Sequence, residues 1–337
     1  MQYHYIPKTG LQVSSLCLGT MTFGAEADAS EAKKMFDLAK ECGINFFDTA
    51  DVYAKGASEK ILGELIKGCR EQVVISSKAY FPVSKDPNGK GMSRYHLIQS
   101  VESSLRRLQT DHLDIFYLHR FDDNMPLEEA LRGVEYLVQA GKILYPAVSN
   151  YAAWQILKAL GIAERNKWMP ICAIQPMYNL VKRQAEVEIL PAAQEEGVAV
   201  FPYNPLAGGL LSGKYFASGS DKAQDSSRLN ATEMYKTRYM TDTAIASAEK
   251  FVALAKNLGF SPVQLAIAWV ASHPAVTAPL VGARNCQQLQ ECIGALDIVM
   301  TPELRTEISS LSYEPPLATD RNEEKTSARF ESITAGP

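Results

Sequence analysis

The sequence predicts an α/β fold, a single (β/α)8 (TIM) barrel with an N-terminal β-hairpin and extra C-terminal helices. Short apolar segments recur along the chain at a nearly fixed interval, and stretches of helical periodicity lie between them. No Pro-, Gly- or Ser-rich linker divides the 337 residues, a length that suits either two ordinary domains or one such barrel. Because continuous apolar strands alternate with helices, we expect a parallel sheet buried on both faces.

The N-terminal segment is expected to form a hairpin over residues 3–13 that closes the bottom of the barrel, with its turn at Thr9-Gly10. Eight strands should follow. We place seven of them at 16–20, 44–47, 73–77, 113–118, 143–148, 171–174 and 198–202. The eighth, 278–281, comes after a longer interval that holds two helical patterns, 243–258 and 261–272. Residues 1–337 are therefore expected to form one domain, with the barrel over about 16–300 and a C-terminal tail over 301–337.

The helical stretches between the strands carry start and stop signals. Ser30 is a plausible N-cap for the first helix, which Gly43 should end, and Ser93 is a plausible N-cap for a later one. A further helix should start near Pro126 and end at Gly141.

Composition and charge exclude several classes of protein. The net charge is −4 and no basic run occurs, so nucleic-acid binding has no support. No apolar stretch is long enough to span a bilayer, and the N-terminus lacks the apolar segment of a signal peptide, so we expect a cytoplasmic protein without a membrane partner. The six cysteines form no CxxC pair and have no suitably spaced His, which favours reduced, mostly buried thiols and no metal site.

Ionisable residues follow three neighbouring predicted strands. Asp48 ends the second strand, Lys78 the third and His119 the fourth, while Tyr53 lies in the loop after Asp48. Function in such barrels is carried at the C-terminal ends of the strands, so these four side chains should meet at one rim. Lys78 is expected to lower the pKa of Tyr53, which would then exchange a proton with a substrate oxygen.

A structural interpretation competes with this one. A single Asp–Lys pair at a strand end, or a single His after an apolar run, more often only stabilises the fold. Four such groups on three successive strands favour a catalytic site.

The residues around this rim also resemble a known family. The segment from Gly43 to Tyr53 (GINFFDTADVY), with Ser58-Glu59 after it, is similar to a signature of the aldo-keto reductases. The stretches 77–78, 104–108 and 141–150 match that family too, and the resemblance extends from about Gly10 to Met300. Within the family, the chain looks like the branch of microbial aryl-alcohol dehydrogenase-like reductases and potassium-channel β subunits.

The resemblance implies a barrel that binds NADP(H) without a GxGxxG fingerprint, which this sequence lacks. It implies that Asp48, Tyr53, Lys78 and His119 form a catalytic tetrad, in which Tyr53 donates a proton as hydride moves to a small carbonyl substrate. The same resemblance also implies which residues contact the cofactor. Gly19, Thr20 and Met21 would lie near the nicotinamide and its ribose, Ser149, Asn150 and Gln175 would bind the carboxamide, and the ring of Tyr203 would stack on the nicotinamide. A strap made of Asn204, Pro205, Leu206, Gly208 and Lys214, together with Arg228, would bind the pyrophosphate, and Gly282, Arg284, Gln288 and Glu291 would bind the adenosine end.

Three positions depart from the family pattern. Ala54 stands where Gly usually follows the catalytic Tyr, Asn204 where Ser is usual, and Glu291-Cys292 where Glu-Asn is common. None of these positions belongs to the tetrad.

The sequence indicates the substrate less clearly than it indicates the cofactor. Phe23 and Tyr80, with Phe81 as a third, are candidates for an apolar or aromatic substrate pocket; alternatively, these rings only pack at the rim. The expected activity is NADPH-dependent reduction of aldehydes or ketones to alcohols. A redox-sensing or scaffold protein that binds NADP(H) and turns over slowly stays open as an alternative, and the sequence gives neither the individual substrate nor the oligomeric state.

Overall fold

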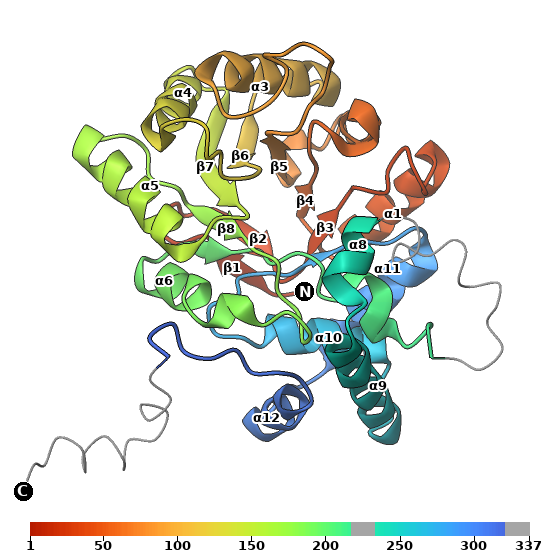
Figure 1. Cartoon of the computed structure of the whole chain (residues 1–337). Helices are drawn as coiled ribbons and strands as arrows, with labels where there is room; N and C mark the ends of the chain where they lie inside the picture. The colour runs from red at the N-terminus through yellow and green to blue at the C-terminus, as the bar shows by residue number, and fades with distance from the viewer. Residues whose placement is uncertain (217–232, 321–337) are drawn as a thin grey trace, which may run out of the picture.

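A closed ring of eight parallel strands, surrounded by helices, forms the centre of the molecule (Figure 1). The computed structural model describes residues 1–216 and 233–320. Its sheet has the strand order β10-β3-β4-β5-β6-β7-β8-β9. The strands are β3 (Cys17–Gly19), β4 (Phe46–Asp48), β5 (Val74–Ala79), β6 (Leu113–Leu118), β7 (Ile143–Ser149), β8 (Ala173–Gln175), β9 (Ala199–Val200) and β10 (Leu280–Val281). The predicted barrel is confirmed.

Backbone hydrogen bonds close the ring between its last two strands. The amide of Leu280 donates to the carbonyl oxygen of Pro202 at 2.8 Å, and the amide of Thr277 donates to that of Val200 at 2.9 Å. On its other side β10 pairs in parallel with β3. The first and last strands of the barrel are therefore neighbours, although more than 250 residues separate them in the sequence.

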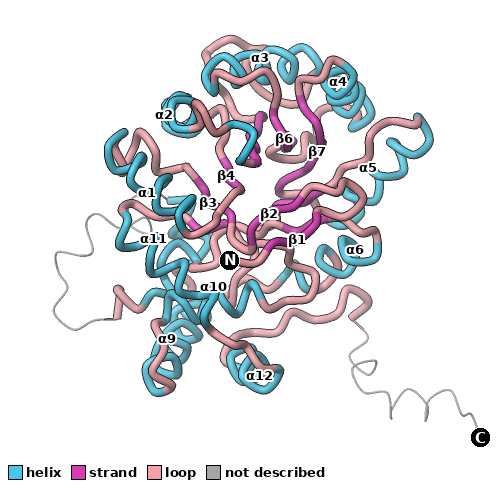
Figure 2. The backbone as a smooth tube through the Cα atoms, turned by 180° about the vertical axis from the view of Figure 1, so that it is seen from behind, coloured by secondary structure: helices cyan, strands magenta, loops and turns pink. Residues whose placement is uncertain are grey.

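The N-terminal hairpin lies across one end of the barrel, as predicted (Figure 2). Its strands are β1 (Tyr3–Tyr5) and β2 (Gln12–Ser14), paired in antiparallel register. Ile6 and Val13 are fully buried and belong to the apolar cluster inside the barrel. The hydroxyl of Tyr145 on β7 donates to the carbonyl oxygen of Thr9 at 3.2 Å, which fixes the turn against the barrel wall.

The helices cover the outside of the sheet. They are α1 (Ala29–Glu41), α2 (Ala57–Leu65), α3 (Arg94–Leu108), α4 (Leu127–Gln139), α5 (Ala153–Asn166), α6 (Ile189–Glu195), α8 (Glu233–Tyr239), α9 (Asp242–Asn257), α10 (Pro262–Ala271), α11 (Cys286–Ile293) and α12 (Pro302–Ser310). Short 3₁₀ segments include η1 (Tyr53–Gly56) and η4 (Ala207–Ser212). In the described part of the chain no single helix is long and apolar enough to cross a bilayer; α9 and α10 reach that length only as a pair bent by 105°.

Two helix starts test the predicted caps. Ser93 caps α3 as expected, because its hydroxyl accepts a hydrogen bond from the amide of His96. The prediction for α1 is wrong by two residues: Asp28, not Ser30, is the N-cap, and its carboxylate accepts from the amide of Glu31 at 2.8 Å. A carboxylate suits the partial positive charge of a helix N-terminus better than a hydroxyl does, so the earlier residue takes the cap.

The core has two parts because alternate side chains of each strand point to opposite faces. Phe46 points into the barrel, where it packs against Phe201 with ring centroids 4.9 Å apart. Phe47 points outward and packs against Phe36 of α1, with ring centroids 4.7 Å apart. The six cysteines are free thiols, three buried and three partly buried.

The packing of α2 on α3 allows a test of the fold. A Cβ atom added at Gly63 would lie 2.7 Å from the backbone of Arg107 and Leu108, so Gly63→Ala should lower the free energy of unfolding by about 1–3 kcal/mol. Gly161→Ala on α5 is the matched control. Its added methyl meets only the end of Arg165 at 3.9 Å, and the higher helix propensity of Ala should stabilise the protein by up to about 1 kcal/mol. Urea unfolding of both variants measures the difference, and equal stabilities would contradict the close approach of the helices.

Candidate active site

Strand alternation explains why polar side chains gather at one end of the barrel interior. On β4, Phe46 points into the barrel, so Asp48 two residues later does too. On β5 the same alternation runs from Val74 to Lys78, and on β6 from Tyr117 to His119 just beyond the strand. These strands are hydrogen-bonded neighbours, so their C-terminal ends meet. On each strand, the inward-facing positions are two residues apart, and they change from apolar residues inside the barrel to a polar residue at its C-terminal end.

Lys78 is the centre of the group. Its Nζ atom forms an ion pair with Asp48, donates to the carbonyl oxygen of Thr49 at 2.7 Å and contacts the hydroxyl of Tyr53 at 3.3 Å. The side chain is fully buried. Burial alone would lower the pKa of Lys78, but the charge of Asp48 and the contact with Tyr53 outweigh it and raise the pKa above its ordinary value. Lys78 therefore stays an ammonium ion.

Asp48 is held by a second set of hydrogen bonds. Its other carboxylate oxygen accepts from Ser76 Oγ at 2.7 Å and from Gln175 Nε2 at 3.0 Å. Thr20 Oγ1 donates to the backbone oxygen of Asp48 at 3.0 Å. Asp48 is 1% exposed and its carboxylate has partners on both oxygens, so it fixes the position of Lys78.

His119 lies beside Tyr53, with ring centroids 6.2 Å apart in an edge-on arrangement. Burial, with the charge of Lys78, lowers the pKa of His119 well below its ordinary value, so its imidazole is neutral at physiological pH. Its Nδ1 atom has no hydrogen-bond partner among the described residues. A neutral imidazole can take part in hydrogen bonds and adds no second positive charge to the site.

The predicted effect of Lys78 on Tyr53 needs correction. The charge of Lys78 does lower the pKa of the phenol, but burial acts more strongly, and the pKa of Tyr53 is raised above its ordinary value. A desolvated phenolate is costly even next to one ammonium, because Asp48 already balances that ammonium. Tyr53 is therefore protonated at neutral pH.

The loop that carries Tyr53 has an unusual backbone. Ala54 and Lys55 have φ values of 46° and 55°, a region that favours glycine, which explains why Gly suits position 54 in the family pattern. Gly56 follows with φ 87°, and a Cβ there would lie 2.9 Å from Cδ of Arg107. Asn204, which stands where Ser is usual, has φ 58°, a conformation that Asn tolerates well.

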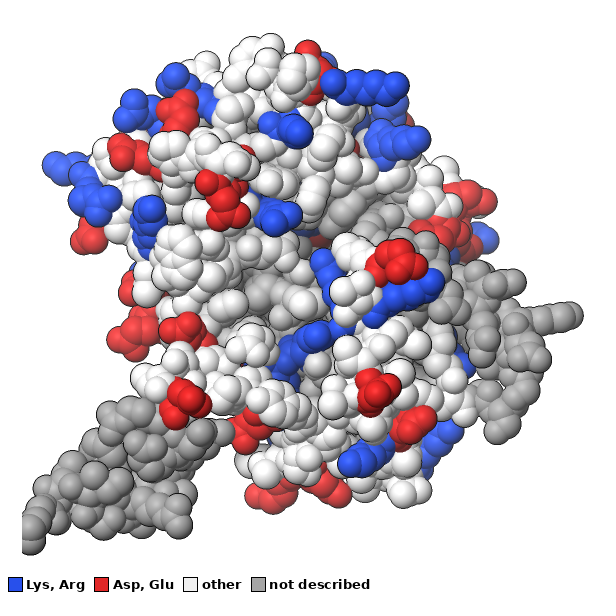
Figure 3. Space-filling model, viewed as in Figure 1, with Lys and Arg blue, Asp and Glu red and all other residues white. Residues whose placement is uncertain are grey.

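The four side chains border a cleft with a volume of about 790 Å³ or lie directly behind it. Lys and Arg side chains surround the hollow in the middle of this face (Figure 3). Of the residues assigned to the cofactor, those that line the cleft are Gly19, Met21, Ser149, Asn150, Gln175, Tyr203, Asn204, Pro205, Leu206, Gly208, Lys214, Gly282, Arg284, Gln288 and Glu291. Thr20 is buried behind the cleft, where it bonds Asp48 and Ser58, and Arg228 lies outside the described residues.

Polar groups near Tyr53 form a connected network. The hydroxyl of Tyr203 donates to Asn150 Oδ1 at 2.7 Å, and Asn150 Nδ2 donates to the backbone oxygen of His119 at 3.0 Å. Ser149 Oγ donates to the backbone oxygen of Gln175 at 2.9 Å. These amides and hydroxyls supply both donors and acceptors, as an amide-bearing ligand requires.

The segment η4, which belongs to the predicted strap, differs from the network near Tyr53 because it combines glycines with a cation. Gly208 and Gly209 have φ values of 68° and 98°, a region that favours glycine. Nζ of Lys214 lies 3.0 Å from the position that a Cβ on Gly209 would take, so the ammonium packs closely against this glycine. A glycine-rich turn in the cleft wall next to a cation suits a phosphate group. The cleft therefore fits a ligand with a neutral amide at one end and phosphates at the other, as a nicotinamide dinucleotide has.

Of the three aromatic residues predicted for the substrate pocket, Phe81 lines the cleft, and Phe23 and Tyr80 do not. Phe23 is fully buried in the core between sheet and helices. Tyr80 is partly buried and packs against Phe81, with ring centroids 5.3 Å apart. Phe81, the third candidate, lines the cleft, and its ring centroid lies 4.9 Å from that of His119. An extended chain alternates its side chains, so a shift of one residue from Tyr80 to Phe81 changes the face that is presented.

Sequence reasoning missed a group of lining residues on α8, namely Met234, Tyr235 and Arg238. The hydroxyl of Tyr239 on the same helix accepts from Asn204 Nδ2 at 3.3 Å, which anchors α8 at the cleft. The spacing of Tyr235 and Tyr239 by four residues was a signal for one buried helix face. Arg120, directly after His119, also lines the cleft and was not assigned to the site.

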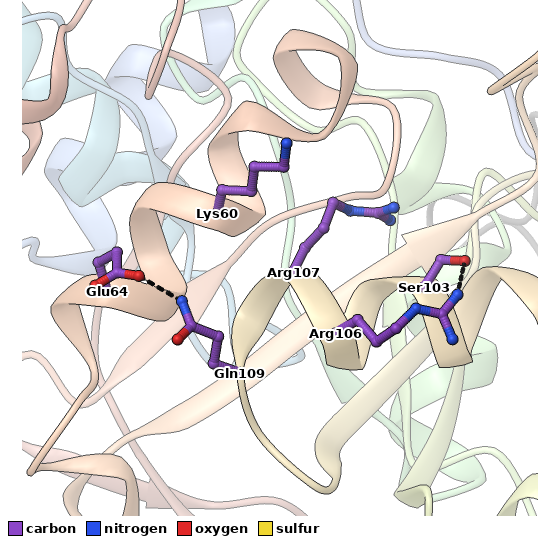
Figure 4. Close-up of a pocket in the computed structure, with 6 residues that line it drawn as sticks. All are labelled: Lys60, Glu64, Ser103, Arg106, Arg107 and Gln109. Atoms are coloured by element: carbon purple, nitrogen blue, oxygen red, sulfur yellow. Dashed lines mark hydrogen bonds between the residues drawn. The ribbon is translucent and has the colours of Figure 1, made fainter.

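A second, smaller hollow of about 490 Å³ lies between α2 and α3, outside the barrel mouth (Figure 4). Gln109 donates to Glu64, and Arg106 donates to Ser103. Arg107 forms an ion pair with the buried Glu59, with Nε 2.6 Å from the carboxylate. None of the four candidate catalytic side chains borders this hollow, whereas Asp48, Tyr53 and His119 border the larger cleft.

Comparison with known proteins identifies relatives along most of the chain. The model of the aldo/keto reductase family matches residues 15–312. A relative in Bacillus subtilis, the uncharacterized oxidoreductase YrpG, is 39% identical over 316 residues, covering 90% of this chain and 94% of the relative. Probable voltage-gated potassium channel β subunits of Oryza sativa and Arabidopsis thaliana are each 36% identical, covering 95% and 94% of this chain and 99% and 98% of their own lengths.

The match spans the barrel, the strands that carry the four polar groups and the strap. Members of this family use a nicotinamide cofactor and act on small carbonyl compounds. From its fold, its site and this match, the chain belongs to the aldo/keto reductase family and is an oxidoreductase.

Proposed function

We propose that the protein reduces aldehydes or ketones to alcohols with NADPH, with Asp48, Tyr53, Lys78 and His119 as its catalytic group. The observation that carries the proposal is the contact of Lys78 with Tyr53 and Asp48, beside a cleft suited to a dinucleotide. When bound, the reduced cofactor supplies a hydride to the carbonyl carbon.

Tyr53 supplies the proton. Its raised pKa keeps the phenol protonated at neutral pH, so the donor is in its donating form before reaction. As hydride reaches the carbonyl carbon, the carbonyl oxygen gains negative charge and takes the proton from the Tyr53 hydroxyl. Lys78, at 3.3 Å, stabilises the phenolate that remains until a proton from water restores it.

His119 and Asp48 act through position and charge. The neutral imidazole of His119 provides a hydrogen bond to the substrate oxygen beside Tyr53 and adds no positive charge. The carboxylate of Asp48 holds the Lys78 ammonium in place. The reverse reaction, oxidation of an alcohol, uses the same groups with Tyr53 as the base.

A carbonyl panel tests the activity. Purified protein with NADPH and an aldehyde such as 4-nitrobenzaldehyde or methylglyoxal should lose absorbance at 340 nm. Tight NADPH binding without turnover of any aldehyde or ketone would overturn the reductase proposal.

The cofactor preference is a separate prediction. Arg284 lines the cleft beside Gln288, whose Oε1 accepts from the Arg284 amide at 3.0 Å, and we assign both to the 2′-phosphate. Arg284→Ala should raise the Kd of NADPH about tenfold or more, because charge-assisted bonds to a phosphate are lost, and should change the Kd of NADH little. Fluorescence titration measures both constants. Equal losses for the two cofactors would place the 2′-phosphate elsewhere.

A second candidate function follows from the relatives named as potassium-channel β subunits. In that case the protein would bind NADP(H) tightly, turn over slowly and report redox state to a partner. The intact set of four catalytic side chains favours the reductase. Slow turnover across the whole carbonyl panel, together with tight cofactor binding, would favour the sensor.

A further inference from the structure

The cleft has two arginines for which neither the cofactor assignment nor the tetrad has a role. Arg120 directly follows His119, and Arg238 lies on α8. The described part of the chain offers no carboxylate within salt-bridge distance of either guanidinium. Their nearest interactions are with aromatic rings: Cζ of Arg120 lies 6.0 Å from the Tyr80 ring centroid, and Cζ of Arg238 lies 6.0 Å from that of Tyr235.

The other charged side chains of the cleft, apart from Lys214 of the strap, already have partners. Asp48 is paired with Lys78, and Glu291 accepts from Ser261 Oγ at 2.7 Å. Arg284 lies 3.7 Å from Glu26. Arg120 and Arg238 thus leave positive charge on the cleft wall that no described acidic side chain balances.

Their place in the cleft is the end where the proton donor lies. Arg120 follows the neutral His119, whose ring packs against Phe81. On the other wall, the charge of Arg238 lowers the pKa of Tyr203, although burial raises that pKa overall to about 12. The Tyr203 hydroxyl bonds Asn150, which in turn bonds the backbone of His119. Both guanidinium groups therefore line the cleft beside residues of the group around His119 and Tyr203, and α8, which carries Arg238, also packs against η4 of the strap.

Arg238 is held there by a fixed helix. Tyr239, the next residue, is fully buried, and its hydroxyl accepts from Asn204 Nδ2 at 3.3 Å and lies 3.2 Å from Met177 Sδ. The buried Tyr235 fixes the preceding turn of α8 against the cleft. Arg238 itself is only partly buried, so its guanidinium stays accessible to a ligand.

We propose that the substrate is a carbonyl compound that also carries an oxyanion, a carboxylate or a phosphate, bound by Arg120 and Arg238. This inference rests on the proposed reductase function. The planar guanidinium matches two oxygens of either group, and the aromatic wall at Phe81 accommodates the body of the substrate between the oxyanion and the carbonyl. The cleft then selects a charged carbonyl compound over its neutral analogue.

Matched aldehyde pairs test the proposal. The first pair is 4-carboxybenzaldehyde and its neutral methyl ester, and the second is 4-formylphenyl phosphate and neutral 4-methoxybenzaldehyde. The kcat/KM for at least one anionic member should exceed that of its neutral analogue about ten- to hundredfold, since hydrogen bonds to a charged group are strong. The pair with the larger ratio identifies the oxyanion.

The variants Arg238→Gln and Arg120→Gln should each reduce that ratio about tenfold, and the double variant should bring it near one. Arg106→Gln is the matched control, because it removes one positive charge from the hollow between α2 and α3 and should keep the ratio of the unmodified protein. Equal rates for both members of each pair would overturn the proposal. So would a tenfold rise in the NADPH Kd of Arg238→Gln with an unchanged ratio, because Arg238 would then bind the cofactor.

A binding measurement separates this proposal from the reductase function. Calorimetric titration of the NADP⁺-loaded protein with the same aldehydes reports recognition without turnover. Preferential binding of an anionic aldehyde without reduction would uphold the oxyanion site and overturn the reductase. Reduction of the aldehydes without preferential binding of the anionic ones would uphold the reductase and overturn the oxyanion site.

Discussion

Replacing Tyr53 with Phe should lower kcat for carbonyl reduction by about 10²–10⁴-fold, the usual contribution of a positioned proton donor. The variant removes one hydroxyl and little surface. The ring still packs beside His119, and Nζ of Lys78 still lies over its face, 4.9 Å from the centroid. Single-turnover reduction at 340 nm measures the chemical step directly.

The same variant should bind NADPH with an unchanged Kd, because the substitution removes the proton donor and leaves the shape of the cleft unchanged. Tyr151→Phe is the matched control: that phenol is also buried, has no hydroxyl partner among the described residues and does not line the cleft. Its kcat should equal that of the unmodified protein. A Tyr53→Phe enzyme with full kcat would remove Tyr53 from the mechanism.

Replacing Lys78 with Met should abolish activity and also lower the free energy of unfolding by about 3–5 kcal/mol, because a buried charge loses its partner. Asp48 is 1% exposed and would be left as an unpaired carboxylate beside Ser76 and Gln175. Urea unfolding near neutral pH measures the loss. The predicted change is large compared with that of a typical point mutation.

The double variant Asp48→Asn/Lys78→Met separates charge from shape. An amide keeps the bonds to Ser76 and Gln175 without a buried charge, so most of the lost stability should return while activity stays absent. Lys33→Met is the surface control, because its pair with Asp37 is exposed and should contribute little to stability. If the double variant were as unstable as Lys78→Met, the cause would be lost packing and not an unpaired carboxylate.

Strands and tetrad were predictable because their signals are local. Each of the eight observed barrel strands begins within two residues of its predicted start, since a strand buried on both faces is a continuous apolar run. The polar residue at the end of such a run still follows the alternation of the strand and points into the barrel. Asp48, Lys78 and His119 therefore lie together. The contact of Tyr53 with Lys78 agrees with the family resemblance.

Features set by tertiary contacts were not predictable. The pKa of Tyr53 depends on how deeply the fold buries it, which no sequence spacing reports. Phe23 and Phe81 are both aromatic residues near the rim, yet the fold buries the first and lets the second line the cleft. The role of α8 depends on Tyr239 meeting Asn204, a contact between segments 35 residues apart.

The pairing of β3 with β10 also has a consequence for synthesis. Leu18 pairs with Val281, so one edge of β3 has no partner until the ribosome has added more than 260 residues after it. At roughly 5–20 residues per second, this leaves a strand edge open for about 13–50 s. Open edges favour intermolecular pairing, so nascent or truncated chains that end before β10 should aggregate, whereas the complete barrel has no free edge.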